Sequence, residues 1–229
     1  MQLHQIQGAD EKDLNSKKFN IGIGISLGNK WFTPENVLEL TKWCLQYTKD
    51  HVIVYVADSI HAVNLEVRNR MTPERAARVA DQKGDQILKE VKEHIDKNLD
   101  SEGLKKIYYA KWKDIVDESY VSKTKFLYSL YESAGQFQDK IHDLIKGFVS
   151  KEDRQFSEDE IHRLGTYLIE EMPEVLARVP IKNLGCDASA YPFDGPLPIF
   201  LENIQKGIVF PEIREKVMDT EPKILLVVR

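Results

Sequence analysis

The chain has 229 residues, of which 42% are hydrophobic, and it carries a formal net charge of -5 at pH 7. This length and hydrophobic content suit one substantial core, so we expect a single domain over residues 1–229, with a poorly ordered N-terminal segment at residues 1–18. No stretch approaches the roughly 20 apolar residues that cross a bilayer, and the polar opening residues contain no signal-peptide core, which predicts a cytoplasmic protein without a membrane partner.

Cysteine usage and net charge exclude further classes. The two cysteines, Cys44 and Cys186, lie far apart in the sequence and outside any metal-ligand spacing. We therefore expect neither a disulfide framework nor a zinc site, and we predict no metal and no cofactor. The acidic net charge does not by itself indicate a nucleic-acid partner, which would need a local basic face.

Short runs rich in β-branched and aromatic residues predict four buried strands, at residues 21–25, 52–56, 106–110 and 224–228. Helical patterns, including residues 118–149, fill the intervals between them. Strands separated by helices indicate an α/β domain with a mostly parallel sheet flanked by helices. In such a sheet, ligands bind beyond the carboxyl ends of the strands.

Capping signals mark where three of the helices begin. Residues 33–35 and 72–74 both read TPE, which places an N-cap threonine before a proline at the first helical position. The second of these opens a long helix towards Asn98. Ser157 starts a capping box for a helix that we expect to end near Pro173.

The stretch NIGIGISLGN, residues 20–29, places Ser26 directly after the first predicted strand. The glycine spacing is one residue too long for G-x-G-x-x-G, so it is weak evidence for a dinucleotide. Residues 24–28 match the nucleophile-elbow pattern G-x-S-x-G, but that motif needs a later histidine base, and the last histidine, His162, lies in a predicted helix. A serine without a base can still accept an acyl group from an activated ester. Alternatively, Ser26 only caps a helix or lines a turn.

Two other segments carry polar residues in a suggestive arrangement. Tyr167 and Glu171 are four residues apart, so they share one face of a predicted helix, where a phenol and a carboxylate could clamp an ammonium group. Further on, Tyr191 and Pro192 form a predicted turn before an apolar helix. Each segment alone also fits an ordinary solvated glutamate or an aromatic anchor.

The segments GISLGN, TYLIEEMP and AYPFDGP, in this order, resemble the three signature segments of the cyclodipeptide synthases. A fourth segment, DESYVSKTKFLYSLYE, is also similar, and the similarity extends from about residue 20 to residue 228. The resemblance implies an enzyme that joins the amino acids of two aminoacyl-tRNAs into a cyclic dipeptide, a diketopiperazine, without ATP. It also implies a single Rossmann-like α/β domain, similar to the catalytic domain of class I aminoacyl-tRNA synthetases.

The resemblance assigns roles to four residues. Ser26 would be the nucleophile of a ping-pong mechanism and would hold the first aminoacyl group as an ester. Tyr167 and Glu171 would bind the α-ammonium of that tethered amino acid. Tyr191 would hydrogen-bond around the serine and relay a proton during transfer and ring closure.

Asn29 and Tyr120 would orient the acyl groups, by the same resemblance. The family divides into a branch with Asn at the position of Asn29 and usually Gln after the signature Tyr, and a branch with Pro after that Tyr and generally no Asn. This chain combines Asn29 with Tyr191-Pro192. The branch to which it would belong therefore stays open.

Alignment with the family also implies a pocket for the first amino acid. An acid and a serine in this pocket favour a polar or charged side chain such as histidine, because a buried carboxylate without a partner is costly. Alternatively, Glu174 points to solvent. The residues expected to line the pocket are Gly22, Gly24, Val54, Trp112, Glu174 and Ser189.

A basic face is the candidate tRNA contact. On the predicted helix from residue 73 to 98, the aliphatic residues share one side, and three basic residues lie within about 60° of each other opposite them, at about 100° per residue. Family members that resemble this chain use a basic helix here to contact phosphates. Acidic residues interrupt the face, so an ordinary solvated surface stays an alternative. The three basic residues of this face are Arg75, Arg78 and Lys89, and Arg68 and Arg70 lie just upstream of the helix.

Two other functions remain open besides the synthase. One is a non-catalytic tRNA- or nucleotide-binding domain, which would bind tRNA without acyl transfer, and the other is a serine esterase that needs no tRNA. The presence of Ser26, Tyr167, Glu171 and Tyr191 together favours the synthase, since binding alone has no use for that set. The sequence does not indicate which oligomeric state the protein adopts.

Overall fold

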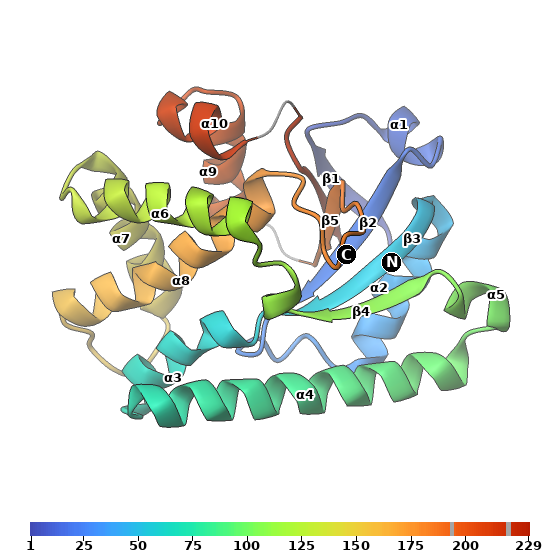
Figure 1. The fold of residues 1–229 in the computed structure, drawn as a ribbon, viewed down its shortest axis with the longest axis horizontal. Coiled ribbons are helices and arrows are strands. Elements are labelled where there is room, and N and C mark those ends of the chain that lie inside the picture. The colour runs from blue at the N-terminus through green and yellow to red at the C-terminus, as the bar shows by residue number, and fades with distance from the viewer. Residues whose placement is uncertain (193–194, 219–220) are drawn as a thin grey trace.

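A six-stranded sheet lies at the centre of the part of the chain that this structure, a computed structural model, describes, namely residues 1–192, 195–218 and 221–229. Its order is β1-β6-β5-β2-β3-β4 (Figure 1). Neighbouring strands are parallel except β1, which is antiparallel to β6. The expected α/β fold with a mostly parallel sheet is thus confirmed. The strands are β1 (Leu3–Gln7), β2 (Phe19–Ile25), β3 (Thr48–Val56), β4 (Ile107–Lys111), β5 (Ala188–Tyr191) and β6 (Ile224–Val228).

The four predicted strands are present as β2, β3, β4 and β6, whereas β1 and β5 were not predicted. β5 has only four residues and lies in a turn-rich stretch. β1 belongs to the segment 1–18, which we expected to be poorly ordered. In the structure it pairs with β6, and the Gln2 N–H donates to the Arg229 carbonyl at 2.6 Å. The same segment forms α1 (Glu11–Asn15), whose Leu14 is buried.

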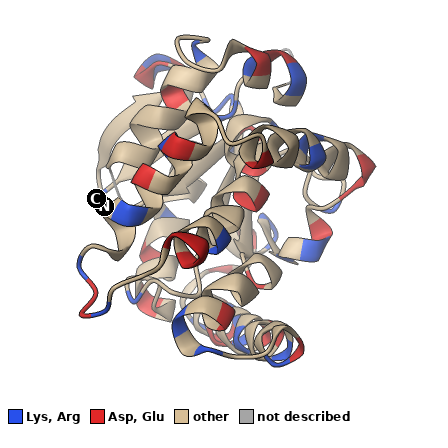
Figure 2. Ribbon diagram, turned by 90° about the vertical axis from the view of Figure 1, so that its left-hand side faces the viewer, with Lys and Arg blue, Asp and Glu red and all other residues tan. Residues whose placement is uncertain are grey.

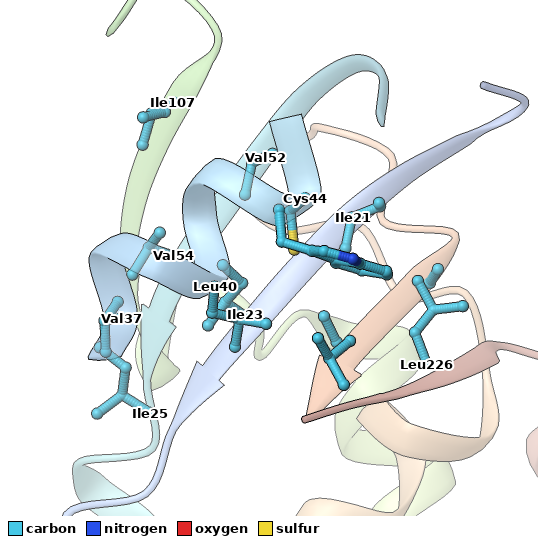
Figure 3. Close-up of a cluster of buried hydrophobic side chains, with 14 of the residues drawn as sticks. Ile21, Ile23, Ile25, Val37, Leu40, Cys44, Val52, Val54, Ile107 and Leu226 are labelled. Carbon is cyan, nitrogen blue, oxygen red and sulfur yellow. The ribbon is translucent and has the colours of Figure 1, made fainter. Parts of the chain in front are cut away.

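Helices α2 (Pro34–Tyr47) and α4 (Pro73–Asn98) begin where the TPE signals predict. The Thr33 hydroxyl accepts from the Asn36 N–H, and the Thr72 hydroxyl accepts from the Arg75 N–H. Both helices contribute apolar residues to one face of the sheet, where each fully buried isoleucine stabilises the fold by about 2 kcal/mol. Figure 3 shows part of this core, including Ile21, Ile23, Ile25, Val37, Leu40, Val52 and Val54.

A group of helices with its own hydrophobic core lies beyond one end of the sheet (Figure 1). Residues 118–149 divide into two of these helices because Ala134 adopts a φ of 51°, a left-handed conformation that ends a helix. The helices are α6 (Glu118–Glu132), α7 (Gln136–Val149), α8 (Glu158–Leu176), α9 (Pro196–Gln205) and α10 (Pro211–Val217). The remaining elements are α3 (Ala62–Asn69), α5 (Ser101–Leu104) and the 3-10 helices η1 (Ser59–His61) and η2 (Trp112–Asp114).

Helix α8 continues to Leu176, so the predicted end near Pro173 is wrong. Proline removes one N–H from the helix, but its own carbonyl still accepts from the Ala177 N–H at 3.1 Å. The extra turn matters for the site, because it carries Glu174 into the protein interior, where only 2% of that residue is exposed.

Candidate active site

A partly enclosed cavity of about 90 Å³ lies at the carboxyl ends of β2, β3 and β5, where these strands meet α8 and α9. Much of its wall is apolar and comes from α9, and its polar groups come mainly from the strands and α8. A largely apolar cavity with a few polar groups at a sheet's carboxyl edge is the usual form of a small-molecule site. The polar lining residues are Gln7, Ser26, Tyr55, Glu171, Glu174, Ser189, Tyr191 and Gln205.

Ser26, Tyr167 and Glu171 lie close together at this cavity, and Ser26 and Glu171 line it. Ser26 directly follows β2, and the Asn29 N–H donates to its carbonyl at 3.1 Å, which closes a tight turn. Tyr167 lies beside both the Ser26 hydroxyl and the Glu171 carboxyl group, close enough to interact with each. Since Tyr167 and Glu171 are one turn apart on α8, the predicted pairing on one helical face is present.

The pKa of Glu171 allows this carboxyl group to change its charge near neutral pH. Burial and the nearby Glu174 raise the pKa of Glu171 from 4.5 to about 8, while the Tyr167 hydrogen bond lowers it. At neutral pH Glu171 is therefore mostly protonated. A cation placed beside it would favour the ionised form. This is the behaviour expected of a carboxyl group that receives an ammonium ion.

Tyr191 and Asn29 complete the surroundings of the serine. The Tyr191 hydroxyl and the Asn29 side chain are hydrogen-bonded, and burial raises the pKa of Tyr191. The Asn29 side-chain oxygen also accepts from the Trp31 N–H at 3.0 Å. Asn29 thus holds both the turn after β2 and the aromatic side chain at the end of β5.

The two strand glycines make room for protein side chains. A Cβ at Gly24 would lie 2.9 Å from the Tyr55 hydroxyl oxygen, and a Cβ at Gly22 would lie 2.7 Å from the Cys186 sulfur. Gly24 and Tyr55 both line the cavity, whereas Gly22 lies beneath Tyr55 and Cys186. Tyr55, which sequence reasoning missed, therefore forms the wall of the pocket over β2.

Val54 does not line the pocket. Successive side chains of a strand point to opposite faces, and Val54 pairs with Ile23 and joins the core beneath α2 (Figure 3). Its neighbour Tyr55 pairs with Gly24 and points to the cavity. The expectation that Val54 lines the pocket is therefore wrong, because a shift of one residue along a strand reverses the face.

Trp112 and Tyr120 also lie outside the cavity, as supports of its walls. The Trp112 ring is 6.4 Å from the Tyr55 ring and 6.1 Å from the Tyr120 ring. The Tyr120 hydroxyl donates to the Glu170 carbonyl at 2.5 Å, and only 1% of Tyr120 is exposed. Tyr120 therefore ties α6 to α8.

Glu174 and Ser189 line the cavity as expected, and they belong to a polar cluster. The Glu174 carboxylate forms an ion pair with Lys223, of which 1% is exposed. The Ser189 hydroxyl donates to the same carboxylate oxygen at 3.3 Å, and Tyr55 hydrogen-bonds to Glu174. The alternative in which Glu174 points to solvent is therefore wrong. Lys223 gave no recognisable signal in the sequence.

The candidate tRNA contacts are exposed but not uniformly basic. Arg75 and Arg78 are exposed on α4, and Arg70 follows α3. Arg68 pairs with Glu152 at 3.1 Å, and Lys89 is 3.9 Å from Glu93. Figure 2 shows basic and acidic segments side by side on α4, which is seen nearly end-on at the bottom of that view. The structure thus leaves both the phosphate-contact and the solvated-face interpretations in place.

Helix α4 is also connected to the serine. An open hollow on the outer side of Ser26 is lined by Asn29 and, from α4, by Lys83 and Glu90. Lys83 was not among the predicted tRNA contacts. His61 is buried against Gly28, and burial, with Lys83 and Arg68 nearby, lowers its pKa to about 4, so it is neutral at physiological pH.

Two kinds of feature are absent from residues 1–192, 195–218 and 221–229. No group of three or more His, Cys, Asp or Glu side chains there could hold a metal ion. None of the helices in these ranges combines the length and the apolar composition that crossing a membrane requires.

The sheet and cavity together define a Rossmann-like α/β domain with a serine-centred site. No protein-family model matches the sequence, and no curated protein matches it. Among solved structures, a cyclodipeptide synthase from Bacillus thermoamylovorans superposes with a TM-score of 0.73 at 18% identity, covering 96% of this chain and 92% of that one. The fold of this chain is thus that of the cyclodipeptide synthases.

Two further solved structures are similar. A Mycobacterium tuberculosis protein, whose structure demonstrates that cyclodipeptide synthetases are related to type I tRNA synthetases, gives a TM-score of 0.67 at 15% identity, covering 97% of this chain and 95% of that one. A cyclodipeptide synthase from Candidatus Glomeribacter gigasporarum, bound to Phe-tRNAPhe, gives a TM-score of 0.52 at 17% identity, covering 92% of this chain and 88% of that one. The Rossmann-like expectation is therefore confirmed.

Proposed function

We propose that this chain is a tRNA-dependent cyclodipeptide synthase, an aminoacyltransferase that joins the amino acids of two aminoacyl-tRNAs into a cyclic dipeptide. The observation that carries this proposal is the grouping of Ser26, Tyr167 and Glu171 at the partly enclosed cavity. The shared fold supports it, since similar structures are cyclodipeptide synthases and one of them is bound to Phe-tRNAPhe.

In the first step Ser26 takes the first aminoacyl group. Its hydroxyl oxygen attacks the ester carbonyl, the bond from that carbonyl to the ribose oxygen breaks, and the serine proton ends on the released tRNA hydroxyl. An aminoacyl ester is already activated, so positioned hydroxyl groups can serve where a strong base is absent. Tyr167 lies beside Ser26, and Tyr191 lies at the same cavity, so both can relay the proton.

Glu171 then holds the tethered amino acid by its ammonium group. Binding of the ammonium ionises Glu171 and releases one proton, which the raised pKa of about 8 permits near neutral pH. Two amide bonds complete the ring, and each forms when an amine attacks an ester carbonyl and an alcohol leaves. One alcohol is the second tRNA and the other is Ser26. Positioning of the two esters is the main contribution of the protein.

The finer expectations form part of the same proposal. The first amino acid is polar, such as histidine, because Glu174 and Ser189 line its pocket. Asn29 orients the acyl group, and the basic residues of α3 and α4 contact tRNA. We take residues 1–229 to form one catalytic domain, because β1 and β6, near the two ends of the described chain, pair in one sheet. A cytoplasmic location follows from the proposed substrates.

The test is the mass of the intact protein after incubation with a pool of aminoacyl-tRNAs. We expect wild-type protein to gain the mass of one aminoacyl group and Ser26→Ala to gain none. Ser122→Ala, which changes an exposed serine on α6, is the matched control. Expression in bacteria should also yield a cyclic dipeptide that depends on Ser26. Tight tRNA binding without acylation would favour the binding-only alternative, and turnover of simple esters without tRNA would favour an esterase.

A further inference from the structure

A buried ion pair that no step of the proposed chemistry uses lies at the cavity wall and directly behind it. Glu174, from the last turn of α8, lines the cavity, and Lys223, the residue before β6, lies behind Glu174. The two residues are 2% and 1% exposed. Burial opposes the charge of Lys223, but Cys186 and Glu174 more than offset this and raise its pKa, so the lysine stays protonated.

The Glu174 carboxylate is already paired with donors from the protein. Lys223 donates to Oε1, Ser189 donates to the same oxygen at 3.3 Å, and Tyr55 hydrogen-bonds to the carboxyl group. A buried carboxylate that lacks such partners attracts a cation, whereas one that is already paired does so weakly. The expectation of a cationic substrate side chain assumed an unpaired Glu174, and that assumption does not hold.

The lysine lies behind the pocket and not in it. Glu174, Ser189 and Tyr55 line the cavity, and Lys223 does not. The backbone of Lys223 is fixed on both sides, because its N–H donates to the Leu176 carbonyl at 3.1 Å and its carbonyl accepts from Gln205 Nε2 at 2.9 Å. A substitution at this position therefore changes the charge behind the pocket without removing a residue of its wall.

The charges of Glu174 and Lys223 cancel, so a substrate side chain of either sign would lie near a group of the same sign. A cationic side chain would face Lys223 behind a carboxylate that is already paired, and an anionic one would face Glu174. In the proposed function, Glu171 already binds the α-ammonium group. The rest of the wall is mainly apolar and includes Val175, Leu197, Pro198, Leu201 and Leu225.

We infer that Lys223 is a specificity-determining residue: by neutralising Glu174 it makes the pocket select a first amino acid with an uncharged side chain. This inference rests on the proposed function and narrows its substrate class. Among polar side chains it admits amides, hydroxyls and neutral imidazole, and it disfavours lysine, arginine, aspartate and glutamate.

The probes are the amides of the twenty amino acids, which carry the α-ammonium group but need no acyl transfer. Their dissociation constants are measured by thermal shift, in parallel with the acylation assay. Wild-type protein should bind the amides of amino acids with uncharged side chains at least tenfold more tightly than lysinamide or argininamide. Lys223→Met, which leaves Glu174 without its partner, should shift this ratio at least tenfold towards the basic amides. Lys216→Met changes an exposed lysine and is the matched control.

Two more variants keep the test decisive if Lys223→Met does not fold. Glu174→Gln leaves the lysine unpaired and should shift binding towards the acidic amides. The double variant Glu174→Gln/Lys223→Met contains neither charge and should keep the preference for uncharged amides. Absence of acylation in wild-type protein alongside this pattern of amide binding would contradict the proposed function and leave the inference supported. A wild-type preference for basic amides, or charge selectivity that is the same in the folded variants, would overturn the inference.

Discussion

Glu171→Gln should change how the free energy of unfolding depends on pH. In the folded chain the pKa of Glu171 is about 8, against 4.5 for an ordinary glutamate, with burial as the main cause. Below pH 4.5 the carboxyl group is protonated in both the folded and the unfolded chain, so the group makes no difference there. As the pH rises to about 8, the unfolded chain releases the proton and the folded chain keeps it, so wild-type stability falls.

The size of this effect follows from the two pKa values. One pH unit corresponds to about 1.4 kcal/mol, so the window from pH 4.5 to about 8 amounts to a loss on the order of 5 kcal/mol. Glutamine does not titrate and does not suffer this loss. Groups common to both proteins cancel in the difference. The free energy of unfolding of Glu171→Gln relative to wild type should therefore rise steadily from pH 5 to pH 8.

Urea unfolding at pH 5, 6, 7 and 8 measures this difference. Glu212→Gln, which changes an exposed glutamate in the first turn of α10, is the matched control and should follow wild type. If the difference in free energy of unfolding between Glu171→Gln and wild type stays constant from pH 5 to pH 8, the assignment of a raised pKa is refuted. The same result would remove the proposed ionisation of Glu171 by the ammonium group.

Three further predictions concern other parts of the molecule. Tyr167→Phe removes the hydroxyl that lies beside Ser26 and Glu171 and should slow acylation at least tenfold in a time course of intact-protein mass. An unchanged rate would count against the proton relay. Lys111→Met should lower the free energy of unfolding by about 2 kcal/mol or more, because Lys111 forms ion pairs with three carboxylates, the nearest at 2.6 Å. A urea midpoint equal to that of wild type would contradict this. Replacing Arg75 and Arg78 by Gln should weaken tRNA binding. The slope of the logarithm of the binding constant against the logarithm of salt concentration should fall by about 1 for each phosphate that the variant no longer neutralises. Lys49→Gln, which changes an exposed lysine, is the control and should keep the wild-type slope.

Local signals in the sequence were sufficient for most elements. The caps at Thr33 and Thr72 predict the starts of α2 and α4 because a capping bond joins residues only three apart. Ser26 could be placed at the edge of the sheet because it follows an apolar strand directly. The Tyr167–Glu171 pair could be placed because four residues make about one helical turn. Each of these inferences depends on neighbours along the chain.

The tertiary structure alone decided which strand residues face the cavity. β3 is buried on both faces from His51 to Val56, so its hydrophobic pattern has no alternation that would separate Val54 from Tyr55. β1 is predominantly polar and is a strand only because β6 pairs with it. Neither property can be read from a short window of sequence.

The charge of the pocket shows the same division between local and non-local information. The sequence by itself determined that Glu174 follows the helix motif that carries Tyr167 and Glu171. Only the fold decided that Lys223, 49 residues further on, would lie beside it and cancel its charge. The reason is physical: burial and pairing depend on contacts between distant segments, whereas capping and helical spacing depend on the chain within a single turn.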